Sequence, residues 1–240
     1  MADLDGRVIA IAGAAGGLGP VVCERLAEAG ATLCCTDVAA DRLGELGTRL
    51  GIGDERFDAE VIDLLDGTAA REWAARLAGR FGRVDGLLHL VGGWRGGEPL
   101  PSFDLADYEW LHDLLVRTVI HSTRAFHDLI AGSAHGRFVL VSSSQARQPD
   151  ATNAAYAAAK AAAESWTLAL ADSFATAEAP ATANVLVVNA ILTPQMRAAN
   201  PDKPYLTFTP AEDIADAITF LCSDAAAKMN GKRLPLHPLR

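Results

Sequence analysis

Short runs of apolar residues alternate with longer amphipathic segments along the whole chain. The apolar runs have strand length and predict strands at residues 7–12, 31–36, 59–63, 86–91, 137–142, 184–188 and 232–236. The segments between them predict helices over roughly residues 18–29, 41–50, 68–81, 105–130, 152–177 and 211–221. Apolar strands that alternate with helices indicate a parallel sheet whose two faces are covered by right-handed crossover helices. The pattern has no linker or repeat, so we predict a single doubly wound α/β domain over residues 1–240.

Two stretches interrupt this alternation. Residues 92–101 follow the fourth predicted strand and read Gly-Gly-Trp-Arg-Gly-Gly-Glu-Pro-Leu-Pro, which is typical of a loop. Residues 194–210 follow the sixth strand and contain four prolines, which disfavour a regular element. Ligands of open α/β sheets bind beyond the carboxyl ends of the strands. We therefore expect substrate loops near residues 92–101 and 193–210.

Composition and charge narrow the classes of partner. The chain has 240 residues, of which 50% are hydrophobic, and carries a net charge of −9, which disfavours nucleic acid and anionic membranes as partners. It shows neither a secretory signal nor an apolar run of membrane-spanning length, so we expect a cytoplasmic protein. The cysteines and histidines lack metal-type spacing, so we predict no metal site. We interpret Cys23, Cys34, Cys35 and Cys222 as reduced, buried residues.

A glycine-rich turn lies between the first predicted strand and the first predicted helix. Residues 12–19 read Ala-Gly-Ala-Ala-Gly-Gly-Leu-Gly, and such turns let backbone N–H groups approach a pyrophosphate at a helix N-terminus. Asp37 ends the second strand, 18 residues after Gly19. A carboxylate at this position accepts hydrogen bonds from the ribose hydroxyls of NAD and repels the 2′-phosphate of NADP. The sequence therefore favours NAD over NADP.

Three residues in the second half of the chain suggest acid–base chemistry. Ser143 ends the fifth predicted strand, and Tyr156 follows thirteen residues later with Lys160 one helical turn beyond it. Residues four apart share a helix face, and a lysine ammonium beside a phenol favours the phenolate. The serine hydroxyl can donate a hydrogen bond to a substrate oxygen on which charge develops. We predict that these three residues form a catalytic group.

On these motifs the chain resembles the short-chain dehydrogenase/reductase family over essentially its whole length. The family's glycine motif matches Gly13, Gly16 and Gly19, and its Tyr-x-x-x-Lys motif matches Tyr156 and Lys160. The resemblance implies a Rossmann fold with a seven-stranded sheet, Tyr156 as general acid/base, and a homotetramer or homodimer. It also implies that Asp63 contacts the adenine, Lys160 the nicotinamide ribose and Thr193 the carboxamide. The expected cofactor-binding residues are Gly13, Gly16, Leu18, Gly19, Asp37, Asp63, Gly92, Lys160 and Thr193.

Three positions depart from the family's pattern. Residues 89–92 read His-Leu-Val-Gly where the family has Asn-Asn-Ala-Gly. Arg117 aligns with the active-site asparagine, which calls the usual proton relay into question. The Pro-Gly pair that usually follows the sixth strand is missing, so we expect a shorter turn over the nicotinamide.

The function we predict is an NAD(H)-dependent oxidoreductase that interconverts a carbonyl and a secondary alcohol on a small molecule. One alternative is a non-redox dehydratase, epimerase or lyase on the same fold, which Arg117 and the short turn suggest. Another is a nucleotide-binding sensor or scaffold without turnover. On the bordering segments we expect an apolar wall from Trp94 and an arginine that binds an acidic or polar group. The candidate substrate-contacting residues are Trp94, Arg95, Gln145 and Asn153, with Arg147 nearby.

Overall fold

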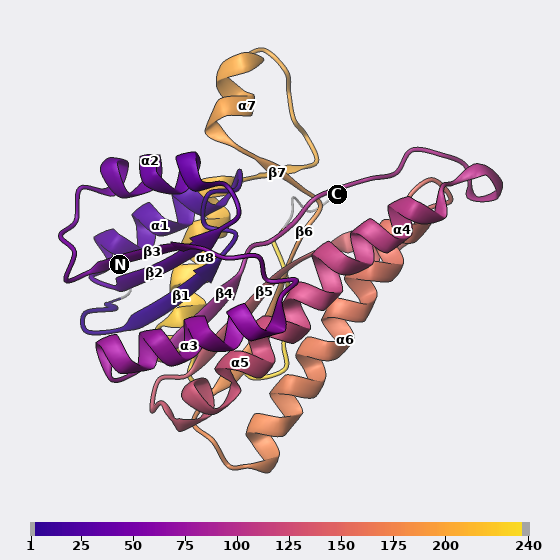
Figure 1. Cartoon of the computed structure of the whole chain (residues 1–240). Coiled ribbons are helices and arrows are strands. Elements are labelled where there is room, and N and C mark those ends of the chain that lie inside the picture. Colours follow the sequence, from indigo (N-terminus) through magenta and orange to yellow (C-terminus); the bar gives the residue numbers. More distant parts are fainter. Residues whose placement is uncertain (1–2, 237–240) are drawn as a thin grey trace.

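The computed structural model describes residues 3–236 and is built on one seven-stranded sheet (Figure 1). The strand order is β3-β2-β1-β4-β5-β6-β9, and every pairing in the sheet is parallel. The order reverses direction beside β1, which defines a doubly wound fold. The predicted α/β class with about seven strands is confirmed. The strands are β1 Val8–Ala12, β2 Thr32–Asp37, β3 Phe57–Val61, β4 Gly86–His89, β5 Arg137–Ser143, β6 Thr182–Val188 and β9 Arg233–Pro235.

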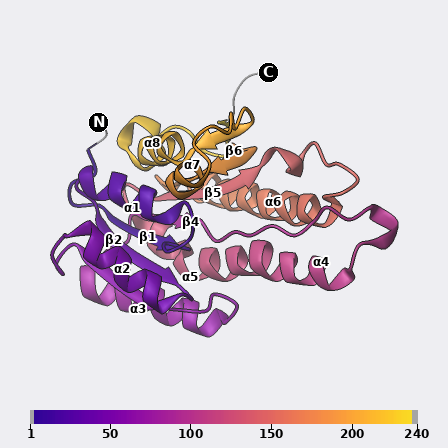
Figure 2. The ribbon, with the colours of Figure 1, turned by 90° about the horizontal axis from the view of Figure 1, so that it is seen from above.

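Helices cover both faces of the sheet, as Figure 2 shows from above. On one face α1 packs against α8, and on the other α3 packs against α5, with α6 beside them. Strands β1, β4, β5 and β6 are buried along their whole length, which explains their nearly continuous apolar sequences. The helices are α1 Gly19–Glu28, α2 Ala40–Leu50, α3 Gly67–Phe81, α4 Leu105–His112, α5 Thr118–Gly132, α6 Ala154–Thr176, α7 Pro194–Ala199 and α8 Ala211–Cys222.

Local signals fix where several elements begin and end. Asp66 caps α3, because its carboxylate accepts hydrogen bonds from the backbone N–H groups of Thr68 and Ala69. The same helix ends at Gly82, whose φ of 72° is a left-handed conformation that favours glycine. The four cysteines are buried and unbridged. No helix within residues 3–236 is long and apolar enough to cross a membrane.

The long helix predicted over residues 105–130 is interrupted. Helix α4 ends at His112, a π-helical turn follows over Asp113–Arg117, and α5 begins at Thr118. A π turn adds one residue to a single helical turn. This changes the spacing of the apolar residues so little that the sequence pattern did not indicate it. Helices α4 and α6 lie side by side in Figure 1 and contact each other.

The proline-rich segment is more regular than the sequence suggested. Pro194 begins α7, a position where its missing N–H costs no hydrogen bond, and Pro210 ends β8 Phe208–Pro210. Strand β8 pairs in parallel with β7 Ala190–Leu192, which follows β6. The prediction of an irregular segment was therefore wrong for residues 194–199 and 208–210 and is confirmed for residues 200–207 between them. Helix α7 projects from the body of the molecule (Figure 1).

Smaller boundary errors also bear on the site. The third strand runs over 57–61 and not 59–63, so Asp63 lies two residues beyond its end.

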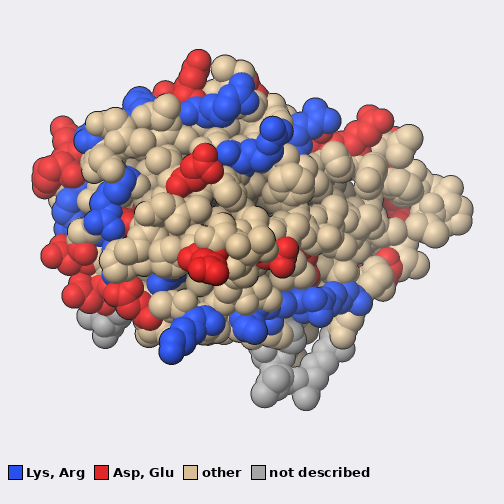
Figure 3. Space-filling model, turned by 90° about the horizontal axis from the view of Figure 1, so that it is seen from below, with Lys and Arg blue, Asp and Glu red and all other residues tan. Residues whose placement is uncertain are grey.

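On the face shown in Figure 3, basic side chains lie among acidic ones, so the net charge of −9 is not gathered into one acidic surface there.

Candidate active site

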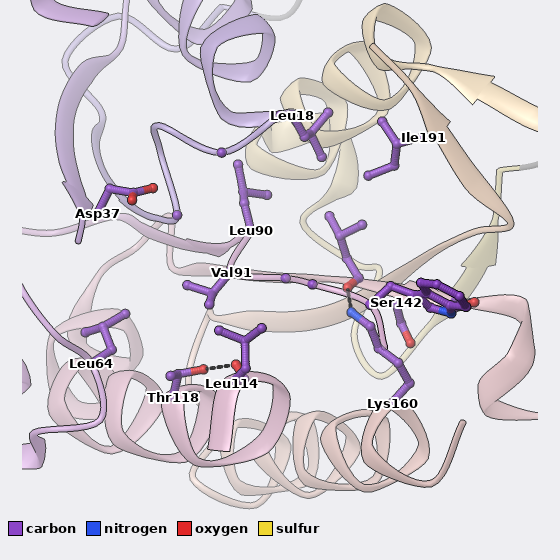
Figure 4. A pocket seen from close by; sticks show the side chains of 18 of the residues that line it. Leu18, Asp37, Leu64, Leu90, Val91, Leu114, Thr118, Ser142, Lys160 and Ile191 are labelled. Carbon is purple, nitrogen blue, oxygen red and sulfur yellow. Dashed lines mark hydrogen bonds between the residues drawn. The ribbon is translucent and has the colours of Figure 1, made fainter. Parts of the chain in front are cut away.

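A cavity of about 890 Å³ opens along the carboxyl edge of the sheet. Its walls come from the carboxyl ends of six strands, represented by Gly13 after β1, Asp37 in β2, Ile62 after β3, Leu90 after β4, Ser143 in β5 and Val188 in β6. In the view of Figure 4, Asp37 and Lys160 lie on opposite sides of this space. The cavity is where a doubly wound sheet binds its ligand, at the reversal of strand order.

The glycine turn forms one wall of the cavity. A Cβ atom on Gly13, whose φ is 79°, would lie 2.7 Å from the backbone nitrogen of Val91. One on Gly19 would lie 2.1 Å from the carbonyl oxygen of Ala14. These two glycines are therefore required by the packing of the chain on itself. Gly16, Gly17 and Leu18 line the cavity, and α1 starts next to them, so the positive end of its dipole faces the space.

At the β2 end of the cavity, Asp37 is held by backbone groups. Its carboxylate accepts hydrogen bonds from the N–H of Ala15 at 3.0 Å and of Ala39 at 3.1 Å. Arg42, which was not predicted from the sequence, lines the same end of the cavity. Its position on the first turn of α2 could have indicated this, because that turn follows β2 closely. This end thus carries one carboxylate and one guanidinium.

An apolar patch adjoins Asp37. Ile62, Leu64 and Leu65 line the cavity with Asp63, whose carboxylate accepts a hydrogen bond from the N–H of Leu65 at 2.9 Å. Such a surface suits a flat, weakly polar ring system with one polar edge.

Ser143, Tyr156 and Lys160 meet at the other end of the cavity. Lys160 is buried, and its ammonium donates a hydrogen bond to the carbonyl oxygen of Val141 at 3.0 Å and lies 5.9 Å from the centre of the Tyr156 ring. Burial lowers the pKa of Lys160 to about 8, although Glu164 opposes this shift. The three predicted catalytic residues line one wall together.

The pKa of Tyr156 moves opposite to our expectation. Burial raises it, and a hydrogen bond with the Ser143 hydroxyl opposes the rise only in part. The chain alone therefore keeps Tyr156 protonated at neutral pH. Desolvation of a phenolate outweighs the nearby lysine, so any lowering of this pKa needs a further positive charge in the cavity.

Behind this wall lies a buried carboxylate that the sequence analysis missed. Glu164 accepts hydrogen bonds from the Ser142 hydroxyl at 2.7 Å and from Nε of Arg233 at 2.8 Å. Arg233 also donates to the carbonyl oxygen of Ser143 at 3.3 Å, which ties β9 to the end of β5. Glu164 lies one helical turn beyond Lys160, and that spacing was the signal available in the sequence.

His89 occupies the position where the family pattern has asparagine. Its Nε2 lies 3.1 Å from the Thr118 hydroxyl and its Nδ1 lies 3.2 Å from the Ser122 hydroxyl. Thr118 donates its own proton to the carbonyl oxygen of Leu114 at 2.6 Å (Figure 4), so Nε2 of His89 is the donor to Thr118. Burial, and secondarily the charge of Lys160, lowers the pKa of His89 to about 3. The imidazole is therefore neutral.

The neutral, buried His89 predicts a specific loss of stability in acid. Its pKa is lower in the folded chain than in the unfolded chain, so the unfolded state binds more protons below pH 6.5 and stability falls as the pH falls towards 3. We expect His89→Gln to remove this contribution, which amounts to about 2 kcal/mol between pH 6.5 and pH 5. Urea unfolding of both proteins at the two pH values measures it, with His112→Gln as the control. A stability difference that stays constant with pH would contradict the assignment.

Arg117 lies outside the cavity. Its guanidinium pairs with the Asp113 carboxylate at 3.2 Å, and its side chain is half exposed. Leu114 and Thr118 face the cavity instead, because the π turn changes which residues point inward. The Arg117 side chain, which aligns with the family's active-site asparagine, therefore does not line the cavity.

The missing Pro-Gly pair leaves a compact connection after β6. Asn189 alone separates β6 from β7, and it accepts a hydrogen bond from the Ser144 hydroxyl at 3.0 Å and donates to the carbonyl oxygen of Thr207 at 3.1 Å. Thr193 lines the cavity, and its methyl group would lie 3.3 Å from a Cβ on Gly17. The segment therefore folds over the glycine turn.

The candidate substrate residues divide into two groups. Trp94 and Gln145 line the cavity, whereas Arg95 and Asn153 do not. Arg95 pairs with Asp107 at 2.8 Å and stacks on Trp110 at 4.1 Å. Neither Arg95 nor Arg147, the arginines expected at the substrate end, belongs to the described lining of the cavity. Of the other predicted site residues, those in the lining are Gly13, Gly16, Leu18, Asp37, Asp63, Gly92, Ser143, Tyr156, Lys160 and Thr193, and Gly19 is not.

Comparison with known proteins agrees with this geometry. The family model described as short chain dehydrogenase matches residues 7–204. The chain belongs to the short-chain dehydrogenase family. Members of this family are oxidoreductases that bind NAD(P) and act on small-molecule substrates.

Individual relatives show how far the likeness extends. The chain is 30% identical to 2,3-dihydro-2,3-dihydroxybenzoate dehydrogenase of Bacillus subtilis, an alignment that covers 70% of this chain and 64% of that protein. It is 28% identical to 7alpha-hydroxysteroid dehydrogenase of Escherichia coli, over 96% of this chain and 92% of that one. The structure of gluconate 5-dehydrogenase from Burkholderia cenocepacia, solved with NADP and tartrate, superposes with a TM-score of 0.84 at 26% identity and covers 98% and 94% of the two chains.

Proposed function

We propose that this short-chain dehydrogenase transfers hydride between NAD(H) and the carbonyl or secondary alcohol of a small molecule, with Tyr156 as the general acid/base. The observation that carries the proposal is one continuous cavity with Asp37 and the glycine turn at one end and Ser143, Tyr156 and Lys160 at the other. The first set suits a dinucleotide, and the second suits proton transfer to an oxygen.

The lining residues fit NAD at its anionic and ribose groups. Gly16 and Leu18 would hold the pyrophosphate beside the start of α1, Asp37 the adenosine ribose, and Lys160 the nicotinamide ribose. Gly92, Thr193 and Asp63 would make the remaining contacts, and Gly19 supports the turn from behind. When bound, NAD supplies the hydride acceptor and a positive charge close to Tyr156. We propose NAD over NADP because the Asp37 carboxylate, fixed by two backbone N–H groups, repels a 2′-phosphate.

Residues of the chain itself bind the substrate oxygen, transfer the proton and hold the reacting groups in place. Ser143 donates a hydrogen bond to the substrate oxygen, and Tyr156 takes its proton during oxidation or returns it during reduction. Lys160, fixed by the Val141 carbonyl, favours the phenolate once the cavity holds a further cation. Glu164 acts as a positioning residue, since it holds Ser142 and Arg233 next to this group. Its negative charge also favours the charged form of Lys160.

A direct screen tests the proposal. Purified protein is incubated with NAD and a panel of secondary alcohols, and with NADH and the matching ketones, while absorbance reports NADH. We expect turnover with some of the pairs and a preference for NAD. NAD binding without any change in NADH over the whole panel would contradict the redox function.

We also propose that the chain forms the homotetramer or homodimer that the family resemblance implies. Light scattering after gel filtration measures the mass of the assembly and so tests this.

A further inference from the structure

Trp94 lies on the segment that joins β4 to α4, and its side chain lines the cavity. Its indole N–H donates a hydrogen bond to Oδ1 of Asn153 at 3.0 Å. Asn153 directly precedes α6, and Tyr156 lies in the first turn of that helix. The indole is therefore anchored to the start of the helix that carries the proposed general acid/base.

Further hydrogen bonds hold the indole in this orientation. Nδ2 of Asn153 donates to both carboxylate oxygens of Asp150 at 2.9 Å, which leaves Oδ1 of Asn153 to face the indole N–H of Trp94. The N–H of Gly97 donates to the carbonyl oxygen of Thr152 at 2.8 Å, so the loop after Trp94 is tied to the same segment. The aromatic ring is thus held in place by the chain itself.

The glycine between these two contacts makes room for the bond between Trp94 and Asn153. A Cβ atom on Gly96 would lie 2.7 Å from Oδ1 of Asn153 and 3.2 Å from Cζ2 of Trp94. A side chain at position 96 would therefore displace the acceptor that holds the indole. This explains why a glycine follows the Trp-Arg pair.

The indole offers apolar surface to the cavity. Trp94 is 58% exposed, and because its N–H is already bonded, the rest of the ring has no donor for a substrate. Leu114 lines the cavity as well, and it packs with Tyr156 against one small apolar cluster. Gly93 brings the loop onto Leu114, since a Cβ there would lie 2.7 Å from its Cδ2 atom. The wall beside Tyr156 is therefore aromatic and aliphatic.

Charged groups at this end are already engaged. The charged residues in the described lining are Asp37, Arg42, Asp63 and Lys160. The first three belong to the Asp37 end, and Lys160 is bonded to the Val141 carbonyl. Arg95, the neighbour of Trp94, is held outside the lining by its ion pair with Asp107. A carboxylate or phosphate on the substrate would thus be buried here without a cation, which is more costly than burying an unpaired neutral group.

We propose that Trp94 selects substrates with an uncharged, apolar ring on the reacting carbon, namely aryl or alicyclic secondary alcohols and the matching ketones. The inference rests on the proposed function. In oxidation the carbinol carbon loses its hydride to NAD and the hydroxyl its proton to Tyr156, which gives the ketone and NADH. The ring packs on the Trp94 indole and is unchanged, and contacts between aromatic rings stabilise the complex beyond simple burial of area.

Matched alcohols test the requirement for an uncharged ring. The probes are 1-phenylethanol, 1-(4-isopropylphenyl)ethanol and 4-(1-hydroxyethyl)benzoate. The isopropyl group and the carboxylate have similar size and branching but differ in charge. We expect the isopropyl compound to exceed the carboxylate about 100-fold in kcat/KM, because the carboxylate would be desolvated without a partner. Equal kcat/KM for these two compounds, or a preference for the carboxylate, would overturn the inference.

Variants of Trp94 test whether this side chain recognises the ring. The readout is kcat/KM for 1-phenylethanol divided by kcat/KM for 2-butanol, which lacks the ring. Trp94→Ala should lower this ratio about tenfold, and Trp94→Phe, which keeps an aromatic ring, should retain most of it. Leu100→Ala removes another exposed apolar side chain of the same segment outside the cavity lining and should leave the ratio unchanged. A ratio that Trp94→Ala leaves unchanged would overturn the inference.

A binding measurement separates this inference from the redox proposal. The Tyr156→Phe protein with NAD is titrated with 1-phenylethanol and with 2-butanol, with and without Trp94→Ala. Tighter binding of 1-phenylethanol that depends on Trp94, with no turnover by the wild-type protein, would support the inference and overturn the redox function. Turnover of both alcohols with equal kcat/KM and equal affinity would overturn the inference and leave the redox function standing.

Discussion

Replacing Tyr156 by phenylalanine will lower kcat/KM of the NAD-dependent reaction about a thousandfold or more. The substitution keeps the ring in its buried place beside Lys160 and removes the hydroxyl that, in our proposal, exchanges a proton with the substrate oxygen. General acid–base catalysis contributes about 10²- to 10⁴-fold to a reaction rate. The proposed mechanism assigns this contribution to the Tyr156 hydroxyl. Steady-state kinetics with the best alcohol from the screen measure the loss.

Controls separate the chemistry of Tyr156 from its packing. Tyr108→Phe removes a hydroxyl on α4 outside the cavity lining and should leave the rate unchanged. Binding of NAD to the Tyr156→Phe protein should stay within about threefold of the wild type, since only the proton-transfer step has been removed. A Tyr156→Phe protein that turns over as fast as the wild type would show that another group moves the proton.

In the proposed mechanism, the same residue sets the direction in which the reaction rates change with pH. Alcohol oxidation needs Tyr156 deprotonated, and burial raises its pKa in the chain alone. The rate of oxidation should therefore rise with pH through the pKa of the NAD complex, and the rate of ketone reduction should fall.

Replacing Asp37 by asparagine will shift the cofactor preference towards NADP about 30-fold. Asparagine keeps an acceptor oxygen for the backbone groups of Ala15 or Ala39 and removes the charge that repels a 2′-phosphate. Like charges held next to each other cost several kcal/mol. A 30-fold shift in preference corresponds to about 2 kcal/mol. Arg42, already at this end of the cavity, would then face the phosphate without a competing carboxylate.

The ratio of kcat/KM with NAD to kcat/KM with NADP measures this shift. Asp41 lies beside Arg42 in the first turn of α2 but outside the cavity lining. Asp41→Asn therefore removes a nearby charge and should leave the ratio unchanged. A wild-type protein that prefers NADP, and loses that preference in Arg42→Ala, would show that Arg42 and not Asp37 governs the choice.

The sequence was informative where local chemistry decides structure. Strands such as β5 could be predicted because burial on both faces makes their central residues apolar, as in Phe138 to Val141. The proximity of Tyr156 and Lys160 could be predicted because they lie four residues apart on one helix. The position of Asp37 at the end of β2 could be predicted because the apolar run that indicates the strand also indicates where the strand ends.

The remainder depends on contacts between distant segments. The π turn at Asp113–Arg117 leaves no clear mark in the apolar pattern, so the alignment of Arg117 with the active-site asparagine did not reveal that Leu114 and Thr118 face the cavity. The contact of Arg233 with Glu164 joins residues 69 apart in the chain. The direction of the Tyr156 pKa shift also follows from burial, which only the packed structure supplies.

One isotope experiment tests the hydride transfer directly. A secondary alcohol that the protein oxidises is prepared with deuterium on its carbinol carbon and incubated with NAD, and the cofactor is analysed by mass spectrometry. We predict that the deuterium appears in NADH in proportion to the ketone formed, and that Tyr156→Phe abolishes both products. Ketone formed without deuterium in the cofactor, or equal transfer by the Tyr156→Phe protein, would contradict the mechanism.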